Sequence, residues 1–488
     1  MAMRLSQLWR AATDAVVDPR DDREVAGLAV DSRRVRPGDC FIAVAGERED
    51  GLLHLPEALA RGAVAVVAGR RPEAPVPVPL LVVPDARRAA ARLAAAFHGR
   101  PSDRLEVVGI TGTKGKTTTA YLLRSILEAA GRPCGMLGTV RYIVGQRDLP
   151  APNTTPGPTD LQRYLAEMVA AGSRAAVLEV SSHALVQHRV AEIRFRAGVF
   201  TNLAQDHLDY HKTPEAYREA KGILFRMLEP GATAVLNLDD PAAGYYRSLA
   251  RVPVVGYSLG PGAEVTAEIH AIDFRGTRLT LRAGDASAPV ATRLMGRHNV
   301  SNILAAAAAA RALGVGLDTI RRGVEALEAV PGRLEPVDAG QDFAVLVDYA
   351  HTEASLRSVL SCLRPLARGR LLCVFGCGGD RDRGKRPAMG RAAESLADIV
   401  FLTSDNPRSE DPEVVLAEIR GGMREPGRAR VLPDRREAIR AAIAEARAGD
   451  VVLIAGKGHE TYQIFRDGAR PFDDRAEARE ALKERRGV

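Results

Sequence analysis

The chain has 488 residues, of which 46% are hydrophobic and 26% charged, and these ordinary globular values exclude a disordered chain or a fibrous repeat. At roughly 150 residues per domain, the length predicts about three domains, each large enough to bury its own core. The formal net charge of +7 comes mostly from dispersed arginine, and aromatic residues make up only 5% of the chain. This pattern argues against a nucleic-acid partner, because nucleic-acid-binding surfaces cluster basic residues and interleave them with aromatic ones.

Lysine is rare in this sequence, and its seven occurrences are at positions 114, 116, 212, 221, 385, 457 and 483. A genome biased toward arginine and alanine explains the composition most simply. Because arginine supplies the general positive charge, each lysine is a candidate for a role that arginine cannot fill.

The sequence predicts a cytosolic, monomeric protein that does not insert into a membrane. The N-terminus lacks the apolar core of a signal peptide, and the apolar run from Ile303 to Ala310 is too short to span a bilayer. The five cysteines are odd in number and scattered, so no disulfide framework is expected. Cys373 and Cys377 have no second ligand pair nearby, which favours buried thiols over a zinc site.

The predicted elements fall into three regions, which we assign as domains 1–98, 99–331 and 332–488. Short apolar runs alternate with helical patterns throughout, which is typical of parallel sheets covered by helices. The fold class is therefore α/β, with a P-loop ATPase-like central sheet and a Rossmann-like C-terminal domain behind a smaller α/β N-terminal domain. The predicted strands are Cys40–Val44, Ala63–Val67, Leu80–Val83, Leu105–Ile110, Ala175–Val180, Ala197–Thr201, Thr233–Asn237, Ala344–Asp348, Leu371–Phe375, Ile399–Thr403 and Val451–Ala455.

A glycine-rich segment joins the strand Leu105–Ile110 to a helix that stops at Gly131. It reads Thr111-Gly112-Thr113-Lys114-Gly115-Lys116-Thr117-Thr118. Glycine backbone and a helix N-terminus together bind phosphate; Lys116 would neutralise the β- and γ-phosphates and the Thr117 hydroxyl would bind Mg²⁺. Position 110 is Ile, so only the shorter G-x-x-G-K-T form of the motif is present. This placement favours ATP binding over a structural turn.

Two further segments are candidates for metal binding. Glu179 ends a predicted strand beside the phosphate loop, where a carboxylate suits Mg²⁺ better than a simple polar cap would. Residues 202–211 contain two Asp and two His, including His207, although most such surface runs are solvated loops.

The run Gly109–Thr118 resembles the ATP loop of the Mur ligases, the amide-forming enzymes that build the peptidoglycan stem peptide. The resemblance extends over nearly the whole chain. It implies that ATP phosphorylates a carboxylate, an amine attacks the acyl phosphate, and amide, ADP and phosphate are released. It also implies catalytic roles for Lys116, Glu179, His207 and Lys221, with His207 at a second Mg²⁺ site. Lys221, an ordinary helix lysine by sequence alone, would be carbamylated (N6-carboxylysine).

The resemblance implies UDP-N-acetylmuramoyl-L-Ala-D-Glu as the carboxylate substrate. Family positions place the muramoyl-peptide part at Asn153, Thr154, Thr155, Ser181, Gln187 and Arg189, the uridine part at Val30, Ser32, Glu47, Arg48 and Glu49, and the nucleotide also at His298, Asn299 and Arg333. By sequence alone, a turn and a loop explain the uridine-binding segment nearly as well, and a helix cap explains His298 and Asn299 equally well. The segment Asp348–Thr352 matches the family, but Glu353-Ala354 replaces the usual Pro-Asp at a helix start.

The third region indicates which amine is used. Asp405-Asn406-Pro407-Arg408 resembles the signature of family members that add meso-2,6-diaminopimelate rather than lysine. Diaminopimelate carries an extra distal carboxylate, which the planar guanidinium of Arg408 can bind bidentately. The family match assigns to this pocket Arg381, Asp405, Asn406, Pro407, Arg408, Gly456 and Glu460, with Glu460 receiving the distal ammonium.

Three other functions are less compatible with the sequence. A folylpolyglutamate synthetase shares the phosphate loop, but Asp405–Arg408 and Gly456–Glu460 argue against it. A nucleotide-regulated nucleic-acid-binding protein requires the basic and aromatic clusters that the chain lacks. A structural ATPase would need no amine pocket.

Overall fold

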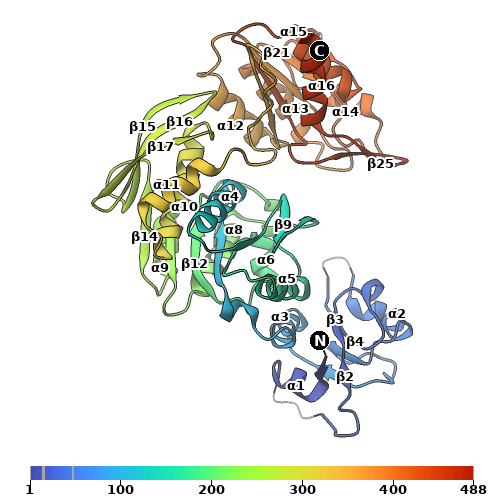
Figure 1. Ribbon diagram of the computed structural model, residues 1–488. Helices are drawn as coiled ribbons and strands as arrows, with labels where there is room; N and C mark the ends of the chain where they lie inside the picture. Colours follow the sequence, from blue (N-terminus) through green and yellow to red (C-terminus); the bar gives the residue numbers. More distant parts are fainter. Residues whose placement is uncertain (1, 14–16, 47–48, 487–488) are drawn as a thin grey trace. The chain divides into compact units, whose positions relative to one another are not determined.

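A computed structural model describes residues 2–13, 17–46 and 49–486, and its secondary structure confirms the α/β class. The predicted uridine residues Glu47 and Arg48 lie outside the described residues. Contacts divide the chain, which is drawn in Figure 1, into two compact units. The first unit comprises Met1–Glu268, Leu281–Ala288 and Ser301–Val324, and the second comprises Ile269–Thr280, Pro289–Val300 and Glu325–Val488.

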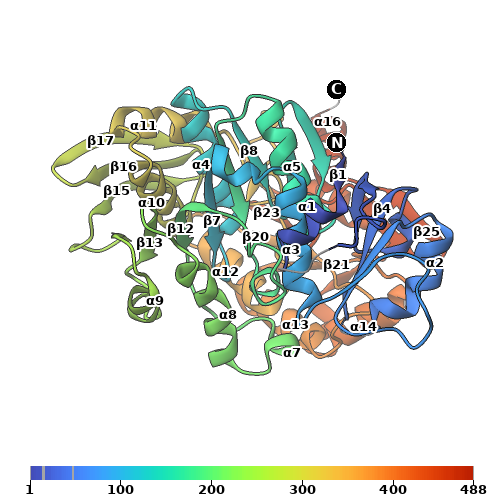
Figure 2. The same ribbon diagram turned by 90° about the horizontal axis from the view of Figure 1, so that it is seen from below.

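The N-terminal part of the first unit contains a parallel sheet in the order β3-β4-β5-β6. Alternate residues of β4 face opposite cores: Cys40 and Ile42 pack with α1 and α3, and Phe41 and Ala43 pack with α2. In Figure 2, α1 and α3 lie on one side of β4 and α2 lies on the other. The elements are β1 Met3–Arg4, α1 Leu5–Arg10, β2 Glu24–Val25, β3 Gly27–Ala29, β4 Asp39–Ala43, α2 Leu55–Ala60, β5 Ala65–Ala68, β6 Leu80–Val82 and α3 Ala86–Phe97.

A second, eleven-stranded sheet has the order β10-β9-β8-β11-β7-β12-β13-β14-β15-β16-β17. The strands from β8 to β15 in this order pair in parallel, whereas β9 and β10 are antiparallel. Its elements up to β12 are β7 Glu106–Thr111, α4 Lys116–Ala129, β8 Cys134–Leu137, β9 Arg141–Val144, β10 Arg147–Pro150, α5 Pro158–Ala170, β11 Ala175–Glu179, α6 Ser182–Val186 and β12 Phe195–Phe200. They continue with α7 Leu208–His211, α8 Pro214–Arg226, β13 Thr233–Asn237, α9 Ala243–Leu249, β14 Val254–Ser258, β15 Val265–Asp273, β16 Gly276–Ala283, β17 Ala286–Thr292, α10 Arg297–Ala312 and α11 Leu317–Ala326.

The central strand β7 positions the phosphate loop, because it lies between β11 and β12 and is buried on both faces. On one face, Val107 packs with residues of α5 and α8. Helix α4 contacts β7, β8 and β11 through residues outside that cluster, which places it over the opposite face. The strand and the helix are therefore both anchored, and the loop between them has little freedom.

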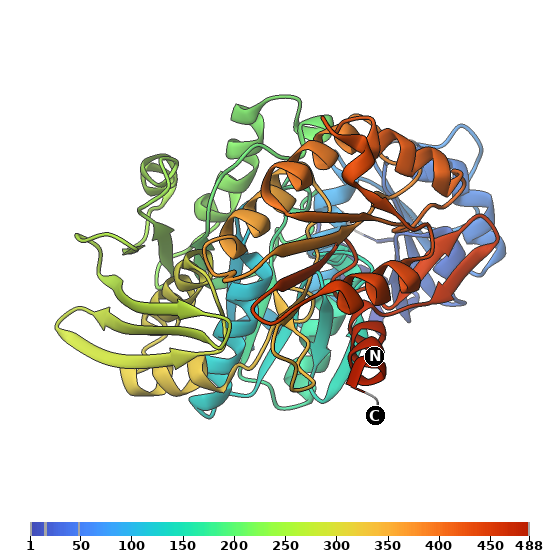
Figure 3. The same ribbon diagram turned by 90° about the horizontal axis from the view of Figure 1, so that it is seen from above.

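The second unit contains a six-stranded sheet in the order β18-β19-β23-β20-β21-β22. Leu371, Cys373 and Phe375 of β20 pack against α12, α13 and α14, while Leu372 and Val374 pack against α15 and α16, so helices cover both faces (Figure 3). The elements are β18 Glu335–Pro336, β19 Ala344–Asp348, α12 Glu353–Leu363, β20 Leu371–Phe375, α13 Lys385–Leu396, β21 Ile399–Leu402, α14 Pro412–Arg420, β22 Arg430–Val431, α15 Arg435–Glu445, β23 Val451–Ala455, β24 Tyr462–Phe465, β25 Gly468–Pro471 and α16 Asp474–Arg486.

The predicted strands are all present, with ends shifted by a few residues at most. The structure adds strands that the sequence pattern did not predict, namely β1, β2, β3, β8, β9, β10, β14, β15, β16, β17, β18, β22, β24 and β25. Several of these are half-exposed: the residues of β10 and most of those of β15 and β17 are intermediate or exposed. Such strands lack the continuous apolar run that marks a buried parallel strand.

Within the described ranges, no helix combines the length and apolar character needed to cross a membrane. Cys373 and Cys377 lie in the core of the second unit, as the buried-thiol interpretation predicted. Burial raises the pKa of the Cys373 thiol to about 12. The cytoplasmic location and the monomeric state stay predictions.

Truncation of the second unit's core should destabilise it far more than truncation of its surface. Leu453 in β23 is fully buried, whereas Val414 in α14 is 45% exposed. We expect Leu453→Ala to lower the free energy of unfolding by about 2–5 kcal/mol and Val414→Ala to change it by less than about 0.5 kcal/mol. Urea titrations followed by circular dichroism measure both; equal losses would contradict the assigned core.

Candidate active site

The phosphate loop is built from backbone that only glycine fits. Gly112 has φ 150°, and a Cβ there would lie 1.9 Å from Thr201 Oγ1. Gly115 has φ 85° and precedes α4; a Cβ there would lie 2.3 Å from Asn302 Oδ1. The loop therefore presents unobstructed backbone at a helix N-terminus, the arrangement that binds phosphate.

Two lysines donate to the same carbonyl oxygen in this loop. Lys116 Nζ is 2.8 Å from Gly112 O and 3.0 Å from Thr113 O. Lys221 Nζ, on α8, is also 2.8 Å from Gly112 O and lies over the ring of Tyr217. Two amino groups therefore lie beside the loop backbone that would bind the phosphates.

Lys221 is not an ordinary exposed helix lysine, since only 1% of it is exposed. Burial, reinforced by the positive charge of Lys116, holds the pKa of Lys221 well below its usual value. A lowered pKa increases the fraction of neutral amine, and only the neutral amine reacts with CO₂. The site therefore favours the chemistry that carbamylation requires.

Glu179 and Thr117 meet behind the loop. Thr117 Oγ1 donates to Glu179 Oε2 at 2.9 Å, and the same carboxylate accepts from Thr139 N and Oγ1. Glu179 ends β11, where it pairs in register with Ile110 of β7, and it is 1% exposed. Parallel pairing therefore brings together the two oxygens that the sequence proposed as Mg²⁺ ligands.

Among the described residues, His207 makes no hydrogen bond or ion pair with Thr117 or Glu179. It has φ 52°, its side chain is 48% exposed, and its ring contacts the rings of His183 and Tyr217. In the part of the chain that the structure describes, no three His, Cys, Asp or Glu side chains are grouped to hold a metal. His211 in the same run is buried, and burial, with His183, Lys221 and His207 nearby, lowers its pKa to about 4.

The residues predicted to hold the muramoyl-peptide part converge at the end of β11. Thr155 Oγ1 donates to Glu179 O at 2.8 Å and accepts from Ser181 N at 3.1 Å. Arg189 Nη1 donates to Thr155 O at 2.8 Å, and its Nε and Nη2 donate to Gln187 Oε1. These residues are connected to the Glu179 strand by hydrogen bonds. Thr154 Oγ1 lies 3.1 Å from Thr139 Oγ1, and the carbonyl of Asn153 accepts from Tyr142.

Of the predicted uridine residues, the structure describes Val30, Ser32 and Glu49, and these make no hydrogen bonds to one another. Ser32 Oγ donates to Glu57 Oε2 at 2.6 Å, and Val30 packs against the N-terminal core. Glu49 contacts His54 at 3.0 Å and makes no hydrogen bond to Ser32. The assignment of Val30, Ser32 and Glu49 to uridine binding stays a prediction from the family match.

The adenine-side candidates lie in the second unit. Asn299 is in the first turn of α10, 4% exposed, and its Nδ2 donates to Met295 O at 2.9 Å. His298 is exposed, and the guanidinium of Arg333 lies 5.1 Å from the centre of the Tyr349 ring. Helix α12 begins at Glu353, as expected for the Glu353-Ala354 departure, and Thr352 caps it.

The three predicted amine-binding segments lie at the carboxyl ends of β20, β21 and β23, which pair in parallel. Asn406 Nδ2 donates to Glu460 Oε2 at 3.0 Å, and Arg408 Nη1 donates to Gly379 O at 2.7 Å. A Cβ on Gly456 would lie 2.6 Å from Asp405 Oδ2. Most of the residues assigned to the amine pocket therefore lie together at these strand ends. Arg381 is exposed and makes no hydrogen bond to another described residue.

Arg408 adopts an unusual backbone conformation with φ 53°. For a residue other than glycine, this left-handed region costs roughly 1–2 kcal/mol. The backbone N of Arg408 donates to Ile464 O at 2.9 Å, which holds this conformation. Strain at a residue proposed to recognise substrate is consistent with a functional role.

Three buried cations around this pocket are absent from the predicted site residues, although lysine scarcity had singled out Lys457. Lys457 Nζ is fully buried, 3.1 Å from Asn406 Oδ1 and 3.0 Å from Glu460 Oε2. Arg435 forms a fully buried ion pair with Asp474 and donates to the carbonyl oxygens of Ser404 and Ala455. The third is Arg386 of α13. Lysine scarcity was the signal for Lys457, but nothing distinguishes two arginines in so arginine-rich a chain.

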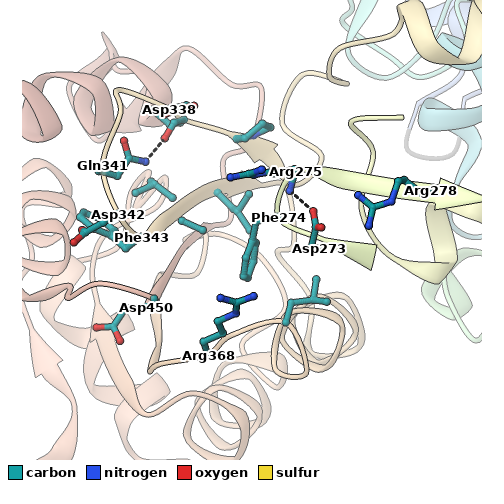
Figure 4. A pocket seen from close by; sticks show the side chains of 17 residues that line it. Asp273, Phe274, Arg275, Arg278, Asp338, Gln341, Asp342, Phe343, Arg368 and Asp450 are labelled. Atoms are coloured by element: carbon teal, nitrogen blue, oxygen red, sulfur yellow. Dashed lines mark hydrogen bonds between the residues drawn. The ribbon is translucent and has the colours of Figure 1, made fainter. Parts of the chain in front are cut away.

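A cavity of ≈ 670 Å³ lies elsewhere in the second unit (Figure 4). Its lining includes Ala344 at the start of β19, Asp450 before β23 and Arg368 before β20. These are the amino ends of the strands, whereas the amine-binding candidates lie at the carboxyl ends. The cavity contains none of the predicted site residues.

Three family descriptions match consecutive parts of the chain. "Mur ligase family, catalytic domain" matches residues 24–98, "Mur ligase middle domain" matches 110–310, and "Mur ligase, glutamate ligase domain" matches 332–458. Together they account for most of the sequence.

Similar proteins have been characterised by sequence and by structure. The UDP-N-acetylmuramoyl-L-alanyl-D-glutamate--2,6-diaminopimelate ligase of Geobacillus kaustophilus is 49% identical over 469 residues, covering 95% of this chain and 96% of that protein. A solved structure of a ligase with the same name is 35% identical, with TM-score 0.71 and full coverage of both chains. A Mycobacterium tuberculosis folylpolyglutamate synthase complexed with ADP and AMPPCP shares the fold, with 21% identity, TM-score 0.61, and coverage of 76% of this chain and 92% of its own.

A side chain at Gly112 should impair nucleotide binding. The clash with Thr201 and the unfavourable φ of Gly112→Ala together should cost at least about 1.4 kcal/mol, roughly tenfold in ATP affinity. Gly244→Ala is the matched control, because a Cβ at that position in α9 meets nothing within 4 Å. Titration with a fluorescent ATP analogue measures both variants; equal affinities for Gly112→Ala and wild type would refute the assignment.

Proposed function

The chain belongs to the Mur ligase family, and from that premise we propose that it is an ATP-dependent ligase that joins meso-2,6-diaminopimelate to UDP-N-acetylmuramoyl-L-Ala-D-Glu. The reaction forms an amide at the D-Glu carboxyl group and releases ADP and phosphate. It serves the synthesis of peptidoglycan precursors. The relatives with 2,6-diaminopimelate ligase names support the choice of substrates.

The observation that carries the proposal is the convergence of Lys116 and Lys221 on the Gly112 carbonyl, 2.8 Å from each Nζ. Phosphoryl transfer to a carboxylate brings two anions together, so the protein must neutralise charge and hold both groups in place. Lys116 and the loop backbone supply that neutralisation for the phosphates. A simple nucleotide-binding module would have no need of a second, buried lysine at the same carbonyl.

The oxygens of Thr117 and Glu179 fit Mg²⁺, because they are buried, 2.9 Å apart, and of the hard oxygen type that this ion prefers. Bound there, Mg²⁺ would neutralise charge on the phosphates. His207 would hold a second ion by family resemblance. Carbamylation of Lys221 would place an anion beside Lys116, at a position where burial and then the positive charge of Lys116 hold the pKa of the free amine well below its usual value.

The chemistry that this chain's residues support proceeds in two steps. A carboxylate oxygen of the D-Glu residue attacks the γ-phosphorus of ATP, while Lys116 holds the transferring charge and ADP leaves. The neutral amine of diaminopimelate then attacks the acyl carbon, phosphate leaves with the former carboxylate oxygen, and the nitrogen loses a proton. The cluster of Thr155, Ser181 and Arg189 would orient the muramoyl-peptide part.

Asp405-Asn406-Pro407-Arg408 supports diaminopimelate over lysine. Arg408 uses Nη1 to donate to Gly379 O, and the rest of its guanidinium makes no hydrogen bond to a described residue. A planar guanidinium binds a distal carboxylate bidentately, and lysine has no such carboxylate. We propose that Glu460, held by Asn406 and Lys457, receives the distal ammonium. The folylpolyglutamate synthase shares only the fold and does not support the rival activity.

The proposal is tested by ADP release with UDP-N-acetylmuramoyl-L-Ala-D-Glu and ATP, comparing meso-diaminopimelate, L-lysine and no amine. We expect turnover that depends on the amine and strongly prefers diaminopimelate. Amine-independent turnover would contradict the ligase, and equal rates with lysine would contradict only the amine assignment.

Arg408→Ala should raise the KM for diaminopimelate by at least roughly tenfold, because a charge-assisted bidentate contact is lost. The KM for ATP should not change. Steady-state kinetics at saturating ATP and carboxylate substrate measure the effect. An unchanged diaminopimelate KM would show that Arg408 is only a surface charge.

Lys221 should carry one CO₂ when the protein is held in bicarbonate. We expect intact-protein mass spectrometry under non-acidic conditions to show this adduct in wild type and not in Lys221→Arg, which should also be inactive. Because the carbamate needs the neutral amine, occupancy and activity should both rise with pH from the acidic side. An active, unmodified Lys221→Arg enzyme would rule the role out.

A further inference from the structure

Arg386 joins the two loops that carry the proposed amine pocket. Its side chain is fully buried, and its two terminal nitrogens donate to both carboxylate oxygens of Glu410 at 2.9 and 2.8 Å. It also donates to Glu418 at 2.6 Å and to Gly378 O at 3.2 Å. One guanidinium therefore connects the loop after β20 to the segment that follows Arg408.

Glu410 and Ser409 complete this connection from the other side. Glu410 Oε1 accepts from Asp380 N at 2.6 Å, and the Asp380 carboxylate accepts from Ser409 Oγ at 2.6 Å and Ser409 N at 3.2 Å. The bidentate contact with Arg386 lowers the pKa of Glu410 to about 2, so its carboxylate is charged at neutral pH. We call Arg386, Glu410, Asp380 and Ser409 the loop clasp.

The loop clasp encloses Arg408. Gly379 N donates to Asn406 O at 2.9 Å, and a Cβ on Gly379 would lie 1.9 Å from Pro407 O, so the two loops are in backbone contact. Together with the hydrogen bond from Arg408 N to Ile464 O, these contacts hold Arg408 at φ 53°. Loosening the clasp removes part of this support, so the φ of Arg408 and the direction of its side chain should shift toward the ordinary region.

We propose that Arg386 and Glu410 are positioning residues that determine selectivity for an amine with a distal carboxylate, because they hold Arg408 in its left-handed conformation. The proposal rests on the function proposed above. Neither residue touches the amine: Arg386 has no exposed surface and Glu410 is engaged by Arg386 and Asp380. Their effect passes through the backbone of Arg408.

A merely structural role makes a different prediction. It would lower thermal stability and reduce active protein, which decreases kcat for every amine and leaves the KM values unchanged. Displacement of Arg408 instead weakens binding of diaminopimelate alone. The KM for this amine, compared with the KM for ATP, therefore separates the two roles.

The experiment compares Glu410→Gln and Arg386→Lys with wild type in the amine-dependent ADP-release assay. Glu410→Gln keeps the shape of the side chain and removes its charge; Arg386→Lys keeps the charge and removes the bidentate contact. We expect each to raise the KM for diaminopimelate by roughly tenfold, with kcat within about threefold and the KM for ATP unchanged. The preference for diaminopimelate over lysine in kcat/KM should fall to the same extent.

Arg383→Ala is the matched control, because Arg383 is an exposed residue of the same segment that pairs with Glu418 and not with Glu410. Its kinetics should equal those of wild type. If the buried variants do not fold, Ser409→Ala opens the clasp without burying an unpaired charge, and it should raise the same KM by a smaller factor. Folded variants with an unchanged diaminopimelate KM would overturn the proposal. A wild-type enzyme without diaminopimelate-dependent turnover would instead overturn the proposed function.

Discussion

The site depends on one constraint: a buried basic side chain must either be paired or lose its charge, because an unpaired buried charge costs several kcal/mol. Both responses occur in this chain. Among the described residues, the basic side chains with at most 1% exposure are Lys221, Arg386, Arg435 and Lys457. Each of them makes at least one hydrogen bond to a segment that carries predicted substrate contacts. Pairing therefore fixes the loops as well as satisfying the charges.

In the first unit, this constraint produces a reactive amine. Lys221 donates to a carbonyl and lies over an aromatic ring, and its burial, reinforced by the charge of Lys116, holds its pKa well below normal. In the second unit the pairing is complete and produces rigidity instead. Arg435 and Asp474 are both fully buried and tie together the ends of β21 and β23 through Ser404 and Ala455. Breaking such a pair by removing one partner typically costs about 3–5 kcal/mol.

Much of this was predictable from the sequence. Most of the buried parallel strands were predicted because each is a continuous apolar run, and the loops at their carboxyl ends followed from that topology; the short, glycine-containing β8 was not predicted. Thr117 and Glu179 could be paired in advance, since a phosphate loop and a strand-ending carboxylate meet in a parallel sheet. The half-exposed strands β10, β15 and β17 could not be predicted, because they lack an apolar run. Nor could the left-handed conformation of Arg408, which depends on contacts made by distant residues.

The central claim is that this protein uses ATP to phosphorylate a carboxylate and so activates it for attack by an amine. It is tested most directly by labelling the D-Glu side-chain carboxylate of UDP-N-acetylmuramoyl-L-Ala-D-Glu with ¹⁸O and analysing the phosphate released in the presence of meso-diaminopimelate. An acyl phosphate transfers one of those oxygens to phosphate each time an amide forms, so labelled phosphate should appear in step with the product. Unlabelled phosphate would mean that water, and not the carboxylate, attacks ATP, and would contradict the account.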